Sequence, residues 1–119
     1  MSQPFEPGDF LVYQLESGYG LIRLLDVEKG EHGDIWHISV YQELFPDVET
    51  AENALSEPKT LHQDKPHLAL TERAFERTPT AKLKNIPLEE SDLIGYRDWM
   101  SSTARQVFDR SLLLLLGMR

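Results

Sequence analysis

The chain contains no cysteine among its 119 residues. This excludes a disulfide framework, a thiolate zinc site and a cysteine nucleophile. Basic side chains are scarce as well, since 12 Lys and Arg stand against 20 Asp and Glu, for a formal charge of −8 at pH 7. Such a charge repels nucleic acid and anionic membrane surfaces at long range and favours a basic partner.

Long apolar runs and targeting signals are also lacking. The longest apolar run, Leu112 to Leu116, is far shorter than the ~20 residues that span a bilayer. Residues 1–10 contain two prolines and no Lys or Arg, unlike the charged start and apolar stretch of a secretory signal. We therefore expect a cytoplasmic protein.

The length and the 40% hydrophobic content predict a single domain over residues 1–119. Its charge is uneven: residues 1–66 carry 13 acidic and 4 basic side chains, and residues 67–119 carry 7 and 8. Residues 42–66 hold six of the acids, three prolines and few apolar residues, which indicates a long acidic connection. Within it, Asp47 to Leu55 predicts a short helix capped by Asp47.

Short apolar alternations separated by glycine turns occupy the first third of the chain. They predict strands at residues 10–15, 21–27 and 34–41, joined as an antiparallel meander. Gly18 and Gly20 are expected to form the bend of the first hairpin, with at least one at positive φ. Further strands are expected at residues 67–75, where 70–75 would also tolerate a helical turn, and at 81–86.

The C-terminal part predicts two helices. Residues 91–100 form the first, and the second opens at Thr103 with a capping box to Gln106, turns Val107, Phe108 and Leu112 to the core, and ends at Gly117. Strands first and helix last is the order of an α+β fold. We expect an antiparallel curled sheet, either an SH3-like small barrel or a bent meander, with the C-terminal helix packed on it.

Motifs that would carry chemistry are sparse. The histidines at 32, 37, 62 and 67 form two pairs five residues apart, a spacing that suits ligand pairs of neither a helix nor a strand. We therefore predict no metal site, no cofactor and no assigned catalytic residue. An alternative stays open, in which the chain is a small enzyme or small-ligand domain with a pocket at the mouth of the curled sheet and His37 or His67 as acid or base.

Binding to another protein is the function that the charge pattern favours. Candidate partner-binding residues combine an aromatic ring at the expected hairpin apex with the acids of the connection: Tyr19, Glu43, Asp47, Glu49, Glu52 and Glu57. The run Leu112 to Leu116 is apolar all around a helix. Either that helix is central or its outer face packs on a second copy, so a homodimer and a structural role in a homo-oligomer are further alternatives.

The opening of the chain resembles that of bacterial polymorphic-toxin immunity proteins. Phe5-Glu6-Pro7-Gly8-Asp9-Phe10, a short strand, and Gly18-Tyr19-Gly20-Leu21 with a second strand carry the resemblance, over residues 5–27. It implies a small sheet domain that binds and blocks a toxin and has no catalysis of its own. Together with the acidic charge, it predicts a non-catalytic protein-binding module that meets a basic protein partner.

Overall fold

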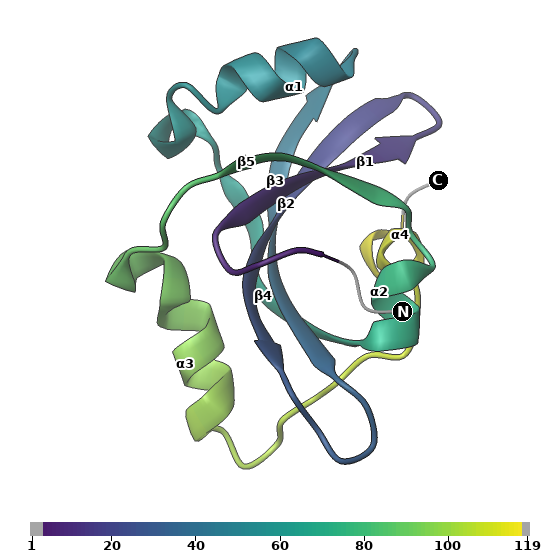
Figure 1. The fold of residues 1–119 in the computed structure, drawn as a ribbon, viewed down its shortest axis with the longest axis vertical. Helices are drawn as coiled ribbons and strands as arrows, with labels where there is room; N and C mark the ends of the chain where they lie inside the picture. The colour runs from purple at the N-terminus through teal and green to yellow at the C-terminus, as the bar shows by residue number, and fades with distance from the viewer. Residues whose placement is uncertain (1–3, 118–119) are drawn as a thin grey trace.

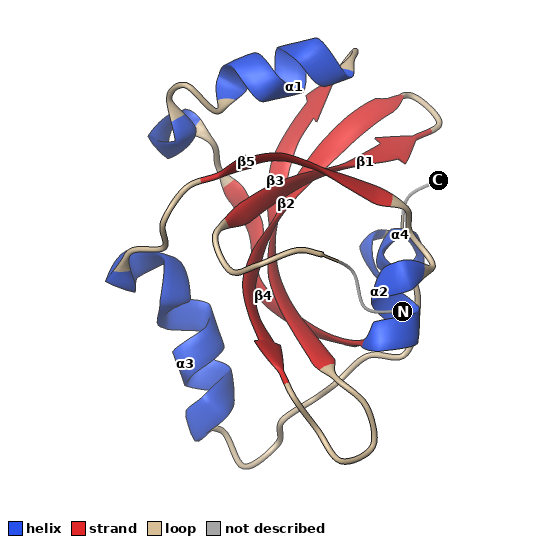
Figure 2. Cartoon of the chain, in the orientation of Figure 1, coloured by secondary structure: helices blue, strands red, loops and turns tan. Residues whose placement is uncertain are grey.

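A computed structural model describes residues 4–117 of the chain. It contains a five-stranded antiparallel sheet in the order β4-β3-β2-β1-β5 (Figures 1 and 2). The first four strands follow one another as a meander, and β5 returns to pair with β1. The strands are β1 (Asp9–Leu15), β2 (Gly18–Glu28), β3 (Ile35–Phe45), β4 (Gln63–Thr71) and β5 (Thr80–Asn85).

The sheet curls without closing, which confirms the α+β fold with a curled antiparallel sheet. The pairing of β2 with β3 changes register after Gly20 and again after Leu24. Such irregularities let long strands bend and increase their twist. Of the two expected forms, the open sheet corresponds to the bent meander.

Short helices lie on both sides of the sheet. In Figure 1, α1 and α3 lie on one side, and α2 and α4 lie on the other. Within residues 4–117, no helix has the length and apolar composition needed to cross a membrane. The helices and 3₁₀ turns of the described part are α1 (Val48–Ala54), η1 (Pro58–Thr60), α2 (Glu72–Glu76), η2 (Glu90–Leu93), α3 (Ile94–Ser101) and α4 (Leu112–Leu116).

Strand alternation produces two hydrophobic clusters, one on each face of the sheet. In β1, Leu11 and Tyr13 join the larger cluster, which also contains buried residues of α2 and α4. Phe10 and Val12 point the opposite way and join the smaller cluster with Ala51 of α1. Successive side chains of a strand face opposite sides, so burying both sets requires helices on both faces.

The first hairpin differs from the expected one in where it bends. Leu15 pairs with Gly18, so Glu16 and Ser17 form the turn, and both glycines lie inside β2. Gly18 has the expected positive φ, at 157°. A Cβ on Gly18 would lie 2.5 Å from the carbonyl oxygen of Phe45, and one on Gly20 would lie 2.4 Å from the ring of Tyr13. These glycines therefore permit close approach of neighbouring groups.

Residues 42–66 are ordered as strand ends, α1 and η1. Asp47 caps α1 as expected, accepting a hydrogen bond of 2.7 Å from the backbone N–H of Thr50. Ala51 and Leu55 are buried against the sheet. This acidic stretch was expected to be a long connection. It instead forms short helices that cover one end of the sheet.

The prediction of a C-terminal helix that begins at Thr103 is wrong for the first half of that segment. Phe108 is extended and bridges Leu70 in parallel, since its N–H donates to Ala69 at 2.8 Å and its carbonyl accepts from Thr71 at 2.9 Å. The carboxylate of Asp109 accepts hydrogen bonds from Thr71 and Arg73. The two bonds with β4 satisfy the backbone N–H and carbonyl of Phe108, which a helix would otherwise have paired.

Only Leu112–Leu116 is helical, and Gly117 ends the helix in the left-handed conformation (φ 66°) as expected. Leu112 is fully buried, and Phe108 is half-buried at the edge of the larger cluster. Val107 is half-buried but does not belong to that cluster. Leu113, Leu115 and Leu116 also pack on this cluster. Leu114 alone of the five leucines is exposed, so the chain itself covers most of the helix.

Candidate functional site

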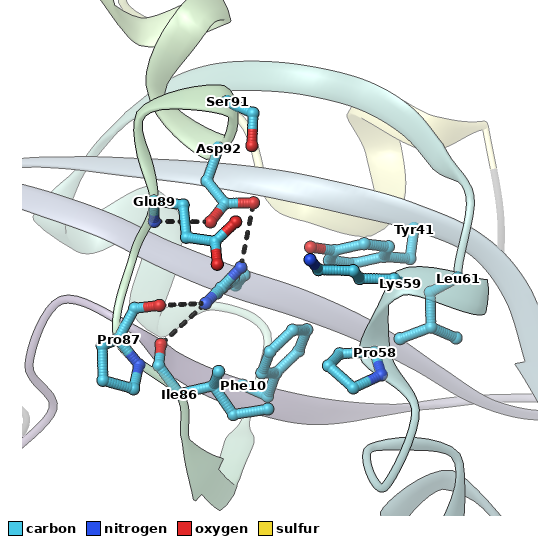
Figure 3. Close-up of a pocket in the computed structure, with 11 residues that line it drawn as sticks. Phe10, Tyr41, Pro58, Lys59, Leu61, Ile86, Pro87, Glu89, Ser91 and Asp92 are labelled. Carbon is cyan, nitrogen blue, oxygen red and sulfur yellow. Dashed lines mark hydrogen bonds and ion pairs between the residues drawn. The ribbon is translucent and has the colours of Figure 1, made fainter.

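A pocket of about 370 Å³ opens on the sheet face that α1 and α3 cover, between η1 and η2 (Figure 3). Phe10 of β1 and Arg23 of β2 contribute to it from the sheet. Figure 3 shows Glu89, Ser91 and Asp92 along one wall, with Tyr41 and Lys59 facing them across the opening. Apolar lining comes from Pro58, Leu61, Ile86 and Pro87.

Arg23 fastens one wall of this pocket to the sheet. Its Nη2 donates to the carbonyl oxygens of Ile86 at 2.7 Å and Pro87 at 3.2 Å, and its Nη1 lies 3.2 Å from Asp92. The guanidinium also lies over the Phe10 ring, 4.6 Å from its centroid. The side chain is only 6% exposed, so Asp92 offsets a charge that burial would otherwise disfavour.

Two further charged side chains line the pocket. Lys59 and Glu89 are both exposed and lie on opposite walls. Within residues 4–117, neither has an ion-pair partner among the salt bridges that the structure forms. The Glu89 carboxylate does accept a hydrogen bond from the backbone N–H of Asp92, as part of the capping box at the start of η2. The pocket therefore presents a positive and a negative group across an apolar floor, an arrangement that can hold a ligand with charges of both signs.

The acidic residues predicted to bind a partner divide into two groups. Glu43 and Asp47 are engaged locally, Glu43 by the N–H and Nδ1 of His62 at 2.9 and 2.7 Å and Asp47 by the cap of α1. Glu49, Glu52 and Glu57 are exposed and form no ion pair within the described residues. Only the second group has carboxylates that are free of such local contacts and can turn toward a partner.

Tyr19 does not lie at the apex of the hairpin, because the turn consists of Glu16 and Ser17. It belongs to β2, opposite Gln14 on one side and Phe45 on the other. The half-buried side chain packs on the smaller cluster, which includes Ala51 of α1. The fold thus brings Tyr19 to the end of the sheet that carries α1.

A second group of polar side chains lies between the sheet and α3. His37 is fully buried, with its Nδ1 2.9 Å from Nε2 of His67 and its Nε2 3.0 Å from Glu28. A carboxylate only accepts, so the tautomers follow: His37 donates to Glu28, and His67 donates to His37. Tyr96 and Trp99 of α3 enclose the His37 ring, with centroids 4.3 and 4.8 Å away.

Burial sets the charge state of this histidine cluster. Burial lowers the pKa of His37 against the opposing effect of Glu28. Burial, with His37 as a second cause, lowers the pKa of His67 to about 4. The Tyr96 hydroxyl donates to Asp26 at 2.8 Å. Both imidazoles are neutral at pH 7, and both ring nitrogens of His37 are occupied, so the cluster fastens α3 to the sheet.

We predict that acid weakens the fold through His67. An unfolded histidine binds a proton below about pH 6.5, whereas the folded one resists until about pH 4. Between these values the unfolded chain binds more protons, so the free energy of unfolding falls as pH falls, by at most about 1.4 kcal/mol per pH unit for one proton. Urea unfolding at a series of pH values from 7 downward measures this slope.

The matched variants for this test are His67→Gln and His32→Gln. Glutamine at 67 can still donate to His37 but does not titrate, so we expect a flatter profile between pH 6.5 and 4 than in the parent chain. His32 lies in the exposed loop between β2 and β3, and its variant should keep the parent profile. An unchanged slope in His67→Gln contradicts the assignment.

One residue in the sequence, Arg23, indicates a buried polar contact near the pocket, although the sequence pattern does not identify its partners. Arg23 is the single charged residue in the run Leu21 to Leu25, whose other members are fully apolar. A lone cation on a buried strand usually has a buried anion nearby. Its partners Ile86 and Asp92 come from more than 60 positions further along the chain, which local patterns cannot indicate.

Comparison with protein-family models, curated proteins and solved structures finds no match to this chain. The likeness to immunity proteins therefore stays a prediction based on residues 5–27. Among residues 4–117, no three or more His, Asp or Glu side chains converge as metal ligands would.

Proposed function

We propose that the chain is a non-catalytic protein-binding module that takes a basic protein partner on the acidic end of its sheet. The observation that carries this proposal is the state of α1, whose Glu49 and Glu52 are exposed and free of ion pairs among the described residues. Glu57 adds a third exposed acid just beyond the helix. Unpaired like charges repel one another at some cost to the fold, and a basic partner relieves that repulsion.

The packing of α1 supports the proposal because it makes the acidic surface rigid. Ala51 and Leu55 anchor the helix in the smaller cluster, and Asp47 fixes its start. A charged surface held in one arrangement loses less conformational entropy on binding than a mobile loop does. Complementary charge then speeds the encounter with a basic surface.

Tyr19 provides an apolar contact beside these acids. It lies half-buried on the strand that pairs with the end of β3, next to the start of α1. Aromatic side chains surrounded by polar ones are common centres of protein interfaces. The immunity-type role, blocking a toxin, is the form of this function that the resemblance over residues 5–27 favours.

The test reverses charge on α1. The double variant Glu49→Lys with Glu52→Lys is expected to lose the basic proteins that the parent chain captures from its own cells, and the parent should lose them as salt rises. With a purified partner, association at low salt should slow at least several-fold. The melting temperature should change little, because both side chains are exposed.

The control is Glu31→Lys with Glu76→Lys, which changes the net charge equally at exposed positions outside α1. This variant should capture the same proteins as the parent. If both double variants lose capture to the same extent, overall charge explains the binding and α1 is no specific surface. Protection of cells from a toxin encoded beside the chain tests the immunity role separately.

A further inference from the structure

We propose that the pocket between η1 and η2 binds a free amino acid with an apolar side chain, held as a zwitterion between Lys59 and Glu89. This ligand differs from the protein partner proposed above. The proposal rests on the pocket's volume, on the separation of its free charges and on its apolar floor.

The volume sets the size of the ligand. At about 370 Å³, the pocket lies at the lower end of the range of about 300–1,000 Å³ for small-molecule sites. A ligand of amino-acid size fits that space. The sheet also holds its base in place, because Phe10 and Tyr41 are buried and pack on each other with ring centroids 5.6 Å apart.

The charges set the kind of ligand. Asp92 already neutralises Arg23, so Lys59 and Glu89 are the charges that remain for a ligand. They lie on opposite walls (Figure 3). A ligand with a single charge meets one of them as a like charge, while a zwitterion places its carboxylate by Lys59 and its ammonium by Glu89.

Polar groups that are already fixed strengthen both ends of the pocket. Tyr41 lines the pocket together with Lys59, and its hydroxyl can donate to the same carboxylate. On the other wall, Asp92 holds the N–H of Glu89 at 2.8 Å while it pairs with Arg23. Arg23 also lines the pocket. Its side chain is more than nine-tenths buried, and its Nε has no hydrogen-bond partner within residues 4–117.

The remaining lining suits an apolar side chain. Pro58, Leu61, Ile86 and Pro87 border the pocket, and Phe10 lines it as well. Burying the side chain of leucine or phenylalanine against this surface removes it from water and contributes favourably to the free energy of binding. The amino acids expected to bind most tightly are therefore the large apolar ones.

The test is calorimetric titration of the full chain at pH 7 with leucine and phenylalanine. We expect saturable binding of one molecule. N-acetylleucine lacks the ammonium and leucinamide lacks the carboxylate, so each should bind at least about tenfold more weakly. Equal binding of these derivatives, or no saturation by leucine and phenylalanine up to about 10 mM, overturns the proposal.

Variants assign the two ends of the ligand. Lys59→Gln should weaken leucine binding at least about tenfold but should not weaken leucinamide binding, because the variant removes a like charge from the leucinamide ammonium. Glu89→Gln should weaken leucine binding but should not weaken N-acetylleucine binding, because it removes a like charge from that ligand's carboxylate. Lys84→Gln and Glu76→Gln remove the same charges from exposed positions outside this pocket and should bind leucine as the parent does. Equal losses in all four variants contradict the assignment.

The outcome is distinguishable from that of the partner-binding test. Glu49 and Glu52 do not line this pocket, so their double reversal should leave leucine affinity within about twofold. If partner capture fails while leucine still binds, the proposed partner-binding function is rejected and the amino-acid site stands. Absent leucine binding with partner capture retained rejects this inference alone.

Discussion

Replacing Phe75 with alanine is expected to lower the free energy of unfolding by about 3–5 kcal/mol. Phe75 in α2 is 2% exposed, and its ring stacks on that of Trp36, with centroids 4.3 Å apart and planes 10° from parallel. Truncation removes this aromatic contact and opens a cavity beside a fully buried Trp36. Urea unfolding, followed by circular dichroism and tryptophan fluorescence, measures the loss.

Phe5→Ala is the matched control for this prediction. Phe5 meets the ring of Phe75 edge-on, with centroids 6.3 Å apart, but it is only half-buried at the start of the described chain. Its truncation should cost about 1 kcal/mol, because partly exposed rings lose less apolar burial. Losses of similar size in the two variants would mean that α2 does not close the larger cluster in the way described.

The strands were predictable because their signals are local. The strands expected at residues 10–15 and 34–41 match β1 and much of β3, and the strand expected at 81–86 is shifted by only one residue in β5. The expected strand from residue 67 is divided, since β4 ends at Thr71 and Thr71 then caps α2. Both possibilities considered for residues 70–75 are thus realised in succession.

The C-terminal segment was mispredicted because its partners are distant in sequence. A capping box at Thr103 is a genuine helix signal, but Phe108 gains two backbone hydrogen bonds from the edge of β4. Asp109 gains further bonds from side chains more than 30 positions away. Tertiary contacts of this kind override local propensity.

The candidate sites show the same limit. The histidines were considered in pairs five residues apart, whereas His37 meets His67 because β3 and β4 pair with His37 opposite Ala69. Side chains two positions from a direct pair on the same face are within reach of each other. Only the register, which a single sequence does not give, reveals that contact.

Replacing Arg23 with methionine is expected to lower the free energy of unfolding by about 3 kcal/mol, the lower end of the range for breaking a buried ion pair. Methionine retains much of the apolar stem but leaves Asp92 and the carbonyl oxygens of Ile86 and Pro87 without their donor. Because Asp92 is 23% exposed, water can partly replace the arginine. Urea unfolding gives the magnitude.

The neighbouring Arg97→Met provides the control, since Arg97 also pairs with an acid of η2, Glu90, at 3.0 Å. Both members of that pair are more than half exposed, and such surface pairs contribute at most about 1 kcal/mol. The two variants remove the same charge from the same neighbourhood and differ mainly in burial. Similar losses in both would contradict the role assigned to Arg23.

A double-mutant cycle separates the ion pair from the rest of the arginine's contacts. Asp92→Asn leaves Arg23 its two carbonyl acceptors, and combining it with Arg23→Met should cost less than the sum of the single changes by at least about 1 kcal/mol. Because Arg23 ties residues 86–92 to β2, hydrogen exchange in Arg23→Met should quicken first in η2 and the start of α3. If hydrogen exchange instead quickened uniformly across the sheet, the substitution would be acting on the core cluster around Phe10. Arg23 would then have no specific role in anchoring the pocket wall.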